Sequence, residues 1–145
     1  MDKHEIRMIV LSGGLLAVFL FAVLYNSYSR KIDMPTCIPF DKTFEKSEIK
    51  EIDKGLYEVY LVAHMWTYDP VDIEIPAGST VDFYLTSTDV VHGFHINEKG
   101  VNMMAIPGSI NKITTRFKEP GTYRFVCNEF CGSGHQNMAG TITVK

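Results

Sequence analysis

The sequence has no excess of basic residues and no internal repeats. Its 145 residues carry 14 Lys plus Arg against 17 Asp plus Glu, a formal net charge of -3. Over residues 32–145 the balance is more acidic, with ten basic against fifteen acidic side chains. Because an acidic domain repels phosphate backbones, the composition argues against a nucleic-acid partner and allows a basic protein partner.

Cysteine is also scarce. The three cysteines, Cys37, Cys127 and Cys131, allow one disulfide and leave one thiol over. A bond between Cys127 and Cys131 is one interpretation. The same segment continues with His135 and Met138, which a structural disulfide does not require, so a metal site is favoured. Cys37 stands alone in MPTCIPF and is expected to be a buried or incidental thiol.

Long hydrophobic runs are limited to one. From Met8 to Tyr25 the segment MIVLSGGLLAVFLFAVLY contains no charge, and a run of this length reaches the lower limit for a helix that spans a bilayer. A cleaved signal peptide is the alternative, but the run is longer than a usual signal core and lacks a small-x-small cleavage site. We therefore expect residues 1–31 to form an uncleaved transmembrane anchor with its flanks.

The apolar run lacks histidine and acidic residues, so it offers neither heme ligands nor a proton path. Its orientation does not follow from charge, because two basic residues precede the run and two follow it.

The remaining sequence predicts a linker followed by strands. Residues 32–55 contain Pro35, Pro39 and a mixed-charge run, which predicts a linker with room for a short helix. From Tyr57 onward, segments such as YEVYLVAHM and VDIEI alternate with a period of two, which is typical of half-buried strands. Further strand-like segments are TVDFYLTS, KITTRF, TYRFVC and TITVK. Residues 56–145 are therefore predicted to form one all-β domain, an antiparallel sandwich or barrel.

Twelve residues near the C-terminus, CNEFCGSGHQNM, contain four soft-metal donors: Cys127, Cys131, His135 and Met138. Thiolate and thioether sulfurs prefer copper(I), and imidazole accepts both copper oxidation states. The set contains no hard oxygen cage for magnesium or calcium. Because a strand ends at Cys127 and the next begins near Gly140, a sandwich would hold this loop at one end, and we predict a copper site there.

A copper pair needs one more terminal nitrogen than the loop supplies. The segment VVHGFH follows a predicted strand and can reach the same end of the sandwich, which makes His92 the expected additional ligand. His95 would point to the opposite face of that strand. His64 lies inside a strand and is expected to be a packed or hydrogen-bonded residue, while His4 is expected to be solvated.

His92 and the pattern CxExCGxxHxxM resemble the binuclear CuA site of cytochrome c oxidase subunit II. The resemblance includes the spacing, the ligand types and the glutamate between the cysteines. It extends through VVHGFH, AHMWTY and NMMAIPGS and covers roughly residues 57–145. It implies a cupredoxin fold, a Greek-key sandwich, with one N-terminal transmembrane helix, in agreement with the strand pattern.

The resemblance also implies a ligand set around two copper ions: bridging thiolates, terminal imidazoles, a weak axial thioether and a backbone carbonyl. The bridging thiolates would be those of Cys127 and Cys131, and the terminal imidazoles those of His92 and His135. Met138 would supply the weak axial thioether, and Glu129 the backbone carbonyl.

By the same resemblance, the chain would accept electrons from cytochrome c. It would pass them to a heme in subunit I, where oxygen is reduced to water. An exposed aromatic residue in the family lies between cytochrome c and the copper centre; Trp66 is the candidate here, with Tyr68 as the alternative. The copper domain is expected on the periplasmic or outer face of a prokaryotic cell membrane.

Departures from the family pattern narrow the subtype. One apolar segment resembles the single-helix subunit II of ba-type, B-family oxidases, whereas mitochondrial-like chains carry two helices. Met104 and Ser109 stand where mitochondrial-like chains commonly place an acid and an arginine, which puts an interface magnesium site in doubt.

Three other classes of copper protein meet obstacles in the sequence. A Sco-like copper chaperone would need alternating helices and strands. A mononuclear blue-copper carrier would not need Cys127. The propeller of a nitrous oxide reductase does not fit this length.

Overall fold

The computed structural model describes residues 2–30, 36–38 and 43–145 of the chain. The chain divides into two units, Met1–Ile32 and Asp33–Lys145. The first unit contains one helix, α1 (Lys3–Arg30). Within it, Lys3–Ser29 contains an 18-residue window with a mean hydropathy of 2.5 and is long and apolar enough to cross a membrane. The expected N-terminal apolar helix is therefore present, and it fits a single-pass membrane protein.

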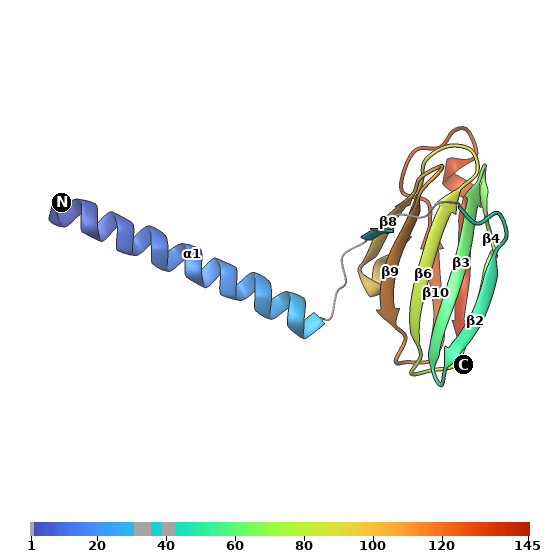
Figure 1. Cartoon of the computed structure of the whole chain (residues 1–145), viewed down its shortest axis with the longest axis horizontal. Coiled ribbons are helices and arrows are strands. Elements are labelled where there is room, and N and C mark those ends of the chain that lie inside the picture. The colour runs from blue at the N-terminus through green and yellow to red at the C-terminus, as the bar shows by residue number, and fades with distance from the viewer. Residues whose placement is uncertain (1, 31–35, 39–42) are drawn as a thin grey trace. The chain divides into compact units, whose positions relative to one another are not determined.

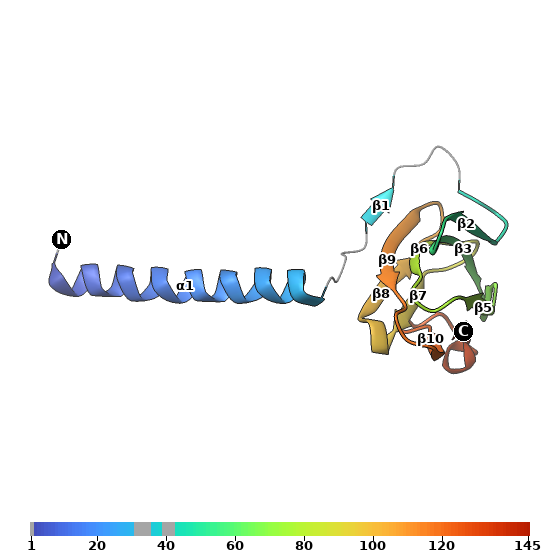
Figure 2. The same cartoon turned by 90° about the horizontal axis from the view of Figure 1, so that it is seen from below.

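The second unit is a sandwich of two β-sheets (Figure 1), whose layers are seen end-on in Figure 2. The first sheet runs in the order β1, β9, β6, β3, β2, with β4 paired to β3, and the second in the order β5, β11, β10, β7, β8. The first sheet consists of β1 (Thr36–Ile38), β2 (Glu48–Asp53), β3 (Leu56–His64), β4 (Thr67–Asp69), β6 (Thr80–Ser87) and β9 (Ile110–Arg116). The second consists of β5 (Asp72–Ile75), β7 (His92–Ile96), β8 (Val101–Ala105), β10 (Gly121–Val126) and β11 (Ala139–Val144). Two 3-10 turns complete the unit, η1 (Asn97–Lys99) and η2 (His135–Asn137).

The period-two pattern of the sequence determines which face each strand buries. In β6, Val81, Phe83 and Leu85 are fully buried, while the side chains between them are partly exposed. Successive side chains of a strand point to opposite faces, so this alternation gives each sheet one apolar face toward the other sheet. The predicted all-β sandwich is confirmed.

The predicted linker over residues 32–55 contributes two strands, and the short helix expected there is absent from its described part. β2 pairs with β3, placing Glu48 opposite Tyr60, and β1 pairs with β9. EIKEID forms a strand because it gains hydrogen bonds from β3, and local charge composition does not reveal a cross-strand partner. Cys37 lies in β1, but its side chain, like Pro35 and Pro39, is outside the described part. The boundaries predicted for the anchor, linker and copper domain stay a prediction.

The sheets are mixed and not purely antiparallel as expected. β3 pairs parallel with β6, and β5 pairs parallel with β11. After β4 the chain leaves the first sheet to form β5 in the second, then returns as β6 at the end where β3 began. Parallel neighbours need such a crossover, and strand pattern alone does not reveal it.

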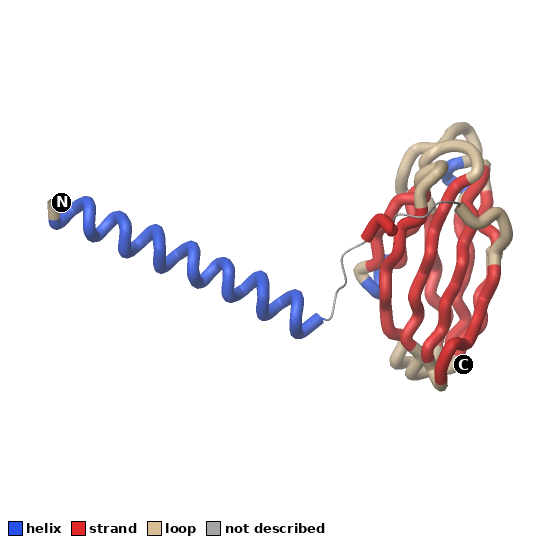
Figure 3. Tube along the Cα trace, viewed as in Figure 1, coloured by secondary structure: helices blue, strands red, loops and turns tan. Residues whose placement is uncertain are grey.

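This pairing places four connections at the same end of the sandwich. β3 and β6 end side by side, and β9, antiparallel to β6, begins there. In the second sheet, β7 and β11 begin and β10 ends there. Figure 3 shows these loops gathered above the strands. The turn and loops at 65–66, 88–91, 106–109 and 127–138 therefore share one end, called the loop end below.

Aromatic rings fill the core beneath the loop end. Phe125 is fully buried, and its ring centroid lies 5.0 Å from that of Phe94 and 5.1 Å from that of Tyr68. A Cβ at Gly140 would lie 2.2 Å from the Phe125 ring, so β11 can lie over this ring only with glycine at that position. Close packing around the Phe125 ring therefore holds together the strands that carry the loop end.

We predict that Phe125→Ala lowers the free energy of unfolding by about 3 to 5 kcal/mol, because the substitution leaves a cavity in a close-packed core. Trp66 is the only tryptophan, so its fluorescence during denaturant unfolding of the full chain in detergent reports on the β-domain. Ile52→Ala is the control, since Ile52 is 50% exposed. Equal losses in both variants would contradict the assignment of Phe125 to the core.

Candidate metal centre

Two buried thiols form the middle of the loop end. Cys127 follows β10, and Cys131 lies four residues further along the loop. Their Sγ atoms are 3.7 Å apart, so the disulfide alternative is not present in the structure. Burial, together with the adjacent Cys127 thiol, raises the pKa of Cys131. In the metal-free chain this thiol is therefore protonated at neutral pH, and a metal must displace the proton to bind.

His92, at the start of β7, faces the two thiols. Its side chain is fully buried, and one ligand atom each from His92, Cys127 and Cys131 lies within 4.8 Å of the others. Nε2 of His92 lies 2.7 Å from Oδ1 of Asp89, whereas the buried Nδ1 has no hydrogen-bond partner in the structure. A buried polar atom without a partner is costly, and a metal ion would satisfy it.

Asp89 holds the His92 ring in this orientation. Its carboxylate also accepts hydrogen bonds from the backbone N–H groups of Met65 and Val90, at 2.7 and 2.6 Å, and from the Ser87 hydroxyl at 3.2 Å. Burial alone would raise the pKa of Asp89, but the bonds from His92, Met65 and Val90 outweigh burial and lower the pKa to about 2. Asp89 is therefore a fixed anion that fixes the position of the His92 imidazole.

Asp89 is not among the site residues expected from the sequence. An acid three residues before a candidate histidine ligand was the available signal.

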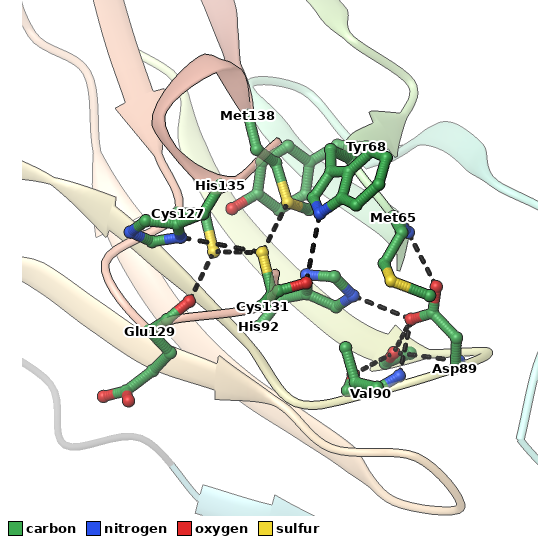
Figure 4. A network of polar contacts seen from close by, with 12 residues as sticks. Met65, Tyr68, Asp89, Val90, His92, Cys127, Glu129, Cys131, His135 and Met138 are labelled. Atoms are coloured by element: carbon green, nitrogen blue, oxygen red, sulfur yellow. Dashed lines mark hydrogen bonds and ion pairs between the residues drawn. The ribbon is translucent and has the colours of Figure 1, made fainter. Parts of the chain in front are cut away.

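The remaining predicted donors also lie at the thiols (Figure 4). Nδ1 of His135 and Sδ of Met138 lie 3.6 and 3.8 Å from Sγ of Cys131. The carbonyl oxygen of Glu129 accepts a bond from the Cys127 thiol at 3.1 Å, and Figure 4 shows its carboxylate pointing away. The fold thus brings together all six groups that the sequence suggested, although their role as metal ligands stays a prediction.

Trp66 lies in the turn between β3 and β4, against the loop of residues 127–138, called the metal loop below. Its side chain is 41% exposed, and its indole N–H donates to the carbonyl of Cys131 at 3.1 Å. A Cβ at Gly134 would lie 2.4 Å from the indole, and one at Gly132 would lie 3.2 Å from Nε1. The two glycines therefore form a seat that lets the indole lie directly on the loop backbone. The sequence placed this aromatic correctly near the site but did not reveal the seat.

Tyr68, the alternative aromatic residue, does not meet the expectation of an exposed side chain. It lies in β4 and is 1% exposed. Its hydroxyl donates to the carbonyl of Gly93, and burial together with the nearby Cys127 and Cys131 raises its pKa. Tyr68 is therefore part of the buried side of the site and is not on its surface.

The other histidines lie outside the cluster. Nδ1 of His95 lies 3.0 Å from the carbonyl oxygen of Val101, in agreement with a ring on the other face of β7. His64 ends β3, is half-buried and has no hydrogen-bond partner for its Nδ1. His4 is exposed in α1.

Comparisons with known proteins agree with this geometry. The family profile described as cytochrome c oxidase subunit II, periplasmic domain, matches residues 25–145. A cytochrome c oxidase subunit 2 from Thermus thermophilus is 47% identical over 89 residues, which cover 61% of this chain and 66% of the relative. The match thus spans slightly less than two thirds of the length of that relative.

Two solved structures share the fold. A chain in a heme-copper terminal oxidase dimer is 41% identical, and the alignment covers 99% of this chain and 100% of that chain with a TM-score of 0.83. The periplasmic domain of subunit II of cytochrome oxidase from Bradyrhizobium japonicum is 21% identical, with coverage of 61% and 83% and a TM-score of 0.57. The β-domain therefore has the cupredoxin-like fold of such domains, and the chain belongs to the cytochrome c oxidase subunit II family.

Proposed function

We propose that this chain is the electron-accepting subunit of a heme-copper terminal oxidase. It receives electrons from cytochrome c at a binuclear copper centre and passes them to heme in subunit I, where oxygen is reduced to water. The observation that supports this most directly is the buried cluster of His92, Cys127 and Cys131, whose ligand atoms lie within 4.8 Å of one another. Membership of the subunit II family supports the choice of partner.

The donor set fits copper better than other metals. It combines two thiols, two imidazoles, a thioether and a backbone carbonyl, and copper is the metal that accepts all of these donor types. The residues that would hold the copper are Cys127 and Cys131 through their thiolates, with His92, His135, Met138 and the Glu129 carbonyl as further donors. A copper pair bridged by two thiolates would supply one-electron transfer with the charge shared between both ions.

The chain itself keeps this site dry and rigid. Cys127, Cys131 and Met138 are between 2% and 7% exposed, so little water reaches the donors. The Cys127 N–H donates to the Met138 carbonyl at 3.0 Å, which joins the two ends of the loop. Donors that cannot move relative to one another keep the same arrangement before and after an electron arrives, which favours fast transfer.

Trp66 is the proposed point of electron uptake. Its indole is exposed on one side and donates to the Cys131 carbonyl on the other, so it connects the surface to a proposed ligand by one hydrogen bond. Other apolar side chains in the loops of the loop end are also exposed: Met65, Val90, Val91 and Phe130. An apolar surface of this kind suits the docking of another protein.

The second cysteine favours a binuclear over a mononuclear site. A mononuclear blue-copper carrier needs one thiolate, yet both thiols are buried here and lie side by side. Met104 and Ser109 stand where mitochondrial-like chains commonly place an acid and an arginine, so the proposal includes copper and no interface magnesium site.

We further propose that α1 anchors the chain in a prokaryotic cell membrane, with the β-domain on the periplasmic or outer face. The apolar helix and the family's description as a periplasmic domain support this placement. A partner subunit in the same membrane would carry the heme, since the apolar run from Met8 to Tyr25 contains no histidine to hold it.

The copper content tests the proposal. The full chain, purified in detergent and loaded with copper, should bind about two ions per chain. Electron paramagnetic resonance should show hyperfine coupling to two near-equivalent nuclei. Cys127→Ser should remove that coupling while the domain stays folded. Coupling to a single copper in the unaltered chain would contradict the binuclear site.

Asp89→Ala should weaken copper binding by about 10-fold to 100-fold, because His92 loses the acceptor that orients its ring. Affinity is measured by competition with a copper chelator, using the full chain. Glu74→Ala is the control, since Glu74 is an exposed acid that pairs with Lys145 far from the site. If the two variants bind copper equally well, Asp89 has no part in positioning His92.

Trp66→Leu should slow cytochrome c oxidation by the assembled oxidase by about tenfold, equivalent to about 1.4 kcal/mol in the barrier. The copper absorption spectrum should not change. Gly134→Ala should also slow the reaction, since the added methyl group would displace the indole. Trp66→Phe keeps a ring but loses the N–H group, so it should be intermediate. Unchanged rates in Trp66→Leu would exclude this residue from electron uptake.

A further inference from the structure

Tyr68 is buried beneath the loop end, so it cannot act as a surface aromatic residue. Its side chain enters the core from β4, and its ring centroid lies 5.1 Å from that of Phe125 and 6.0 Å from that of Phe94. These neighbours hold the ring, while the hydroxyl reaches β7 beneath the metal loop. The hydroxyl is buried near the thiols, and the proposed electron-transfer function gives it no role.

The hydroxyl binds one particular residue of β7, Gly93. It donates to the carbonyl of Gly93, whose own N–H donates to Sγ of Cys127 at 3.4 Å. Gly93 is thus held at its carbonyl by Tyr68 and bound at its nitrogen to a thiol. Figure 4 shows the Tyr68 hydroxyl on the same side of the site as Cys127.

Gly93 has no side chain that could hold it in place. A Cβ there would lie 1.9 Å from Oδ1 of Asn128 and 2.8 Å from the Asn128 backbone nitrogen, so glycine is needed for the loop to approach β7. Glycine is also the residue with the most backbone freedom. The pairing of β7 with β8, which places Gly93 opposite Met104, holds the strand, and bonds to the Gly93 backbone set the direction of its N–H; the buried Tyr68 hydroxyl supplies one of them.

We propose that Tyr68 is a positioning residue that tunes the reduction potential of the metal centre by holding Gly93, so that the Gly93 N–H stays bonded to the Cys127 sulfur. This inference rests on the proposed copper site. Hydrogen bonds to a ligating sulfur draw electron density from it, and such bonds are among the groups that set the potential of thiolate-bound metals. Holding the N–H in place favours the reduced state, so losing the hydroxyl should lower the potential.

The test is a redox titration of the full copper-loaded chain in detergent. The absorption of the copper centre is recorded at each potential. Tyr68→Phe keeps the ring and removes the hydroxyl. At a fixed ambient potential, the ratio of reduced to oxidised copper should fall by about tenfold, equivalent to about 59 mV for one electron. Tyr123→Phe is the matched control, because its hydroxyl also donates to a backbone carbonyl, that of Glu119 at 3.0 Å. That variant should titrate like the unaltered chain.

The outcomes separate this inference from the proposed function. If the unaltered chain binds no copper, the proposed function fails. If it binds copper and Tyr68→Phe has the same potential and the same sulfur-to-copper absorption, Tyr68 has only a structural role and the inference is wrong. A shift in Tyr68→Phe and not in Tyr123→Phe supports it.

A second variant covers the case in which Tyr68→Phe does not fold. Site-specific 3-fluorotyrosine at position 68 keeps the ring and the hydroxyl but makes the hydroxyl a stronger donor, so the fold should be kept. The reduced-to-oxidised ratio at fixed potential should then rise above that of the unaltered chain. A ratio equal to or below that of the unaltered chain would overturn the inference.

Discussion

The pairing of β10 with β11 closes the metal loop at its base, and the rest of the site depends on this closure. Val126 lies opposite Ala139, and the next hydrogen bond joins the Cys127 N–H to the Met138 carbonyl. Twelve residues are thereby confined between two adjacent strands. Within that span the donors have few ways to be arranged, so the loop geometry follows from the sheet register.

Strand β7, in the same sheet, completes the site by bringing His92 to the loop. Gly93 lets the loop come within contact of β7, which places His92 beside the thiols. Asp89 and Tyr68 hold β7 from opposite directions, one through the His92 ring and one through the Gly93 carbonyl. The site thus has a buried side that fixes its chemistry, while Trp66 and Phe130 form a surface side that another protein can contact.

The part of this arrangement that depends on local spacing could be predicted from sequence. Cys127, Cys131, His135 and Met138 lie within one loop, and alternating residues such as those of β6 reveal their strands. Contacts between distant segments could not be predicted in the same way. The segment of β2 has the composition of a linker and becomes a strand only through its partner β3, and the parallel pairing of β3 with β6 requires a crossover through the other sheet.

In the candidate site, too, the features set by local spacing can be predicted from sequence, and those set by contacts between distant segments cannot. His92 was chosen because the donor count required a second imidazole, whereas Asp89 and the glycine seat of Trp66 are defined only by tertiary contacts. Tyr68 and Trp66 are close in sequence, yet one is buried and the other exposed, a difference that depends on where β4 meets the core.

We propose that two thiolates of one closed loop hold a pair of copper ions. X-ray absorption at the copper edge of the copper-loaded chain tests it most directly. We expect sulfur neighbours from both thiolates and a second copper as a short-range scatterer. A single sulfur ligand with no copper neighbour would contradict it.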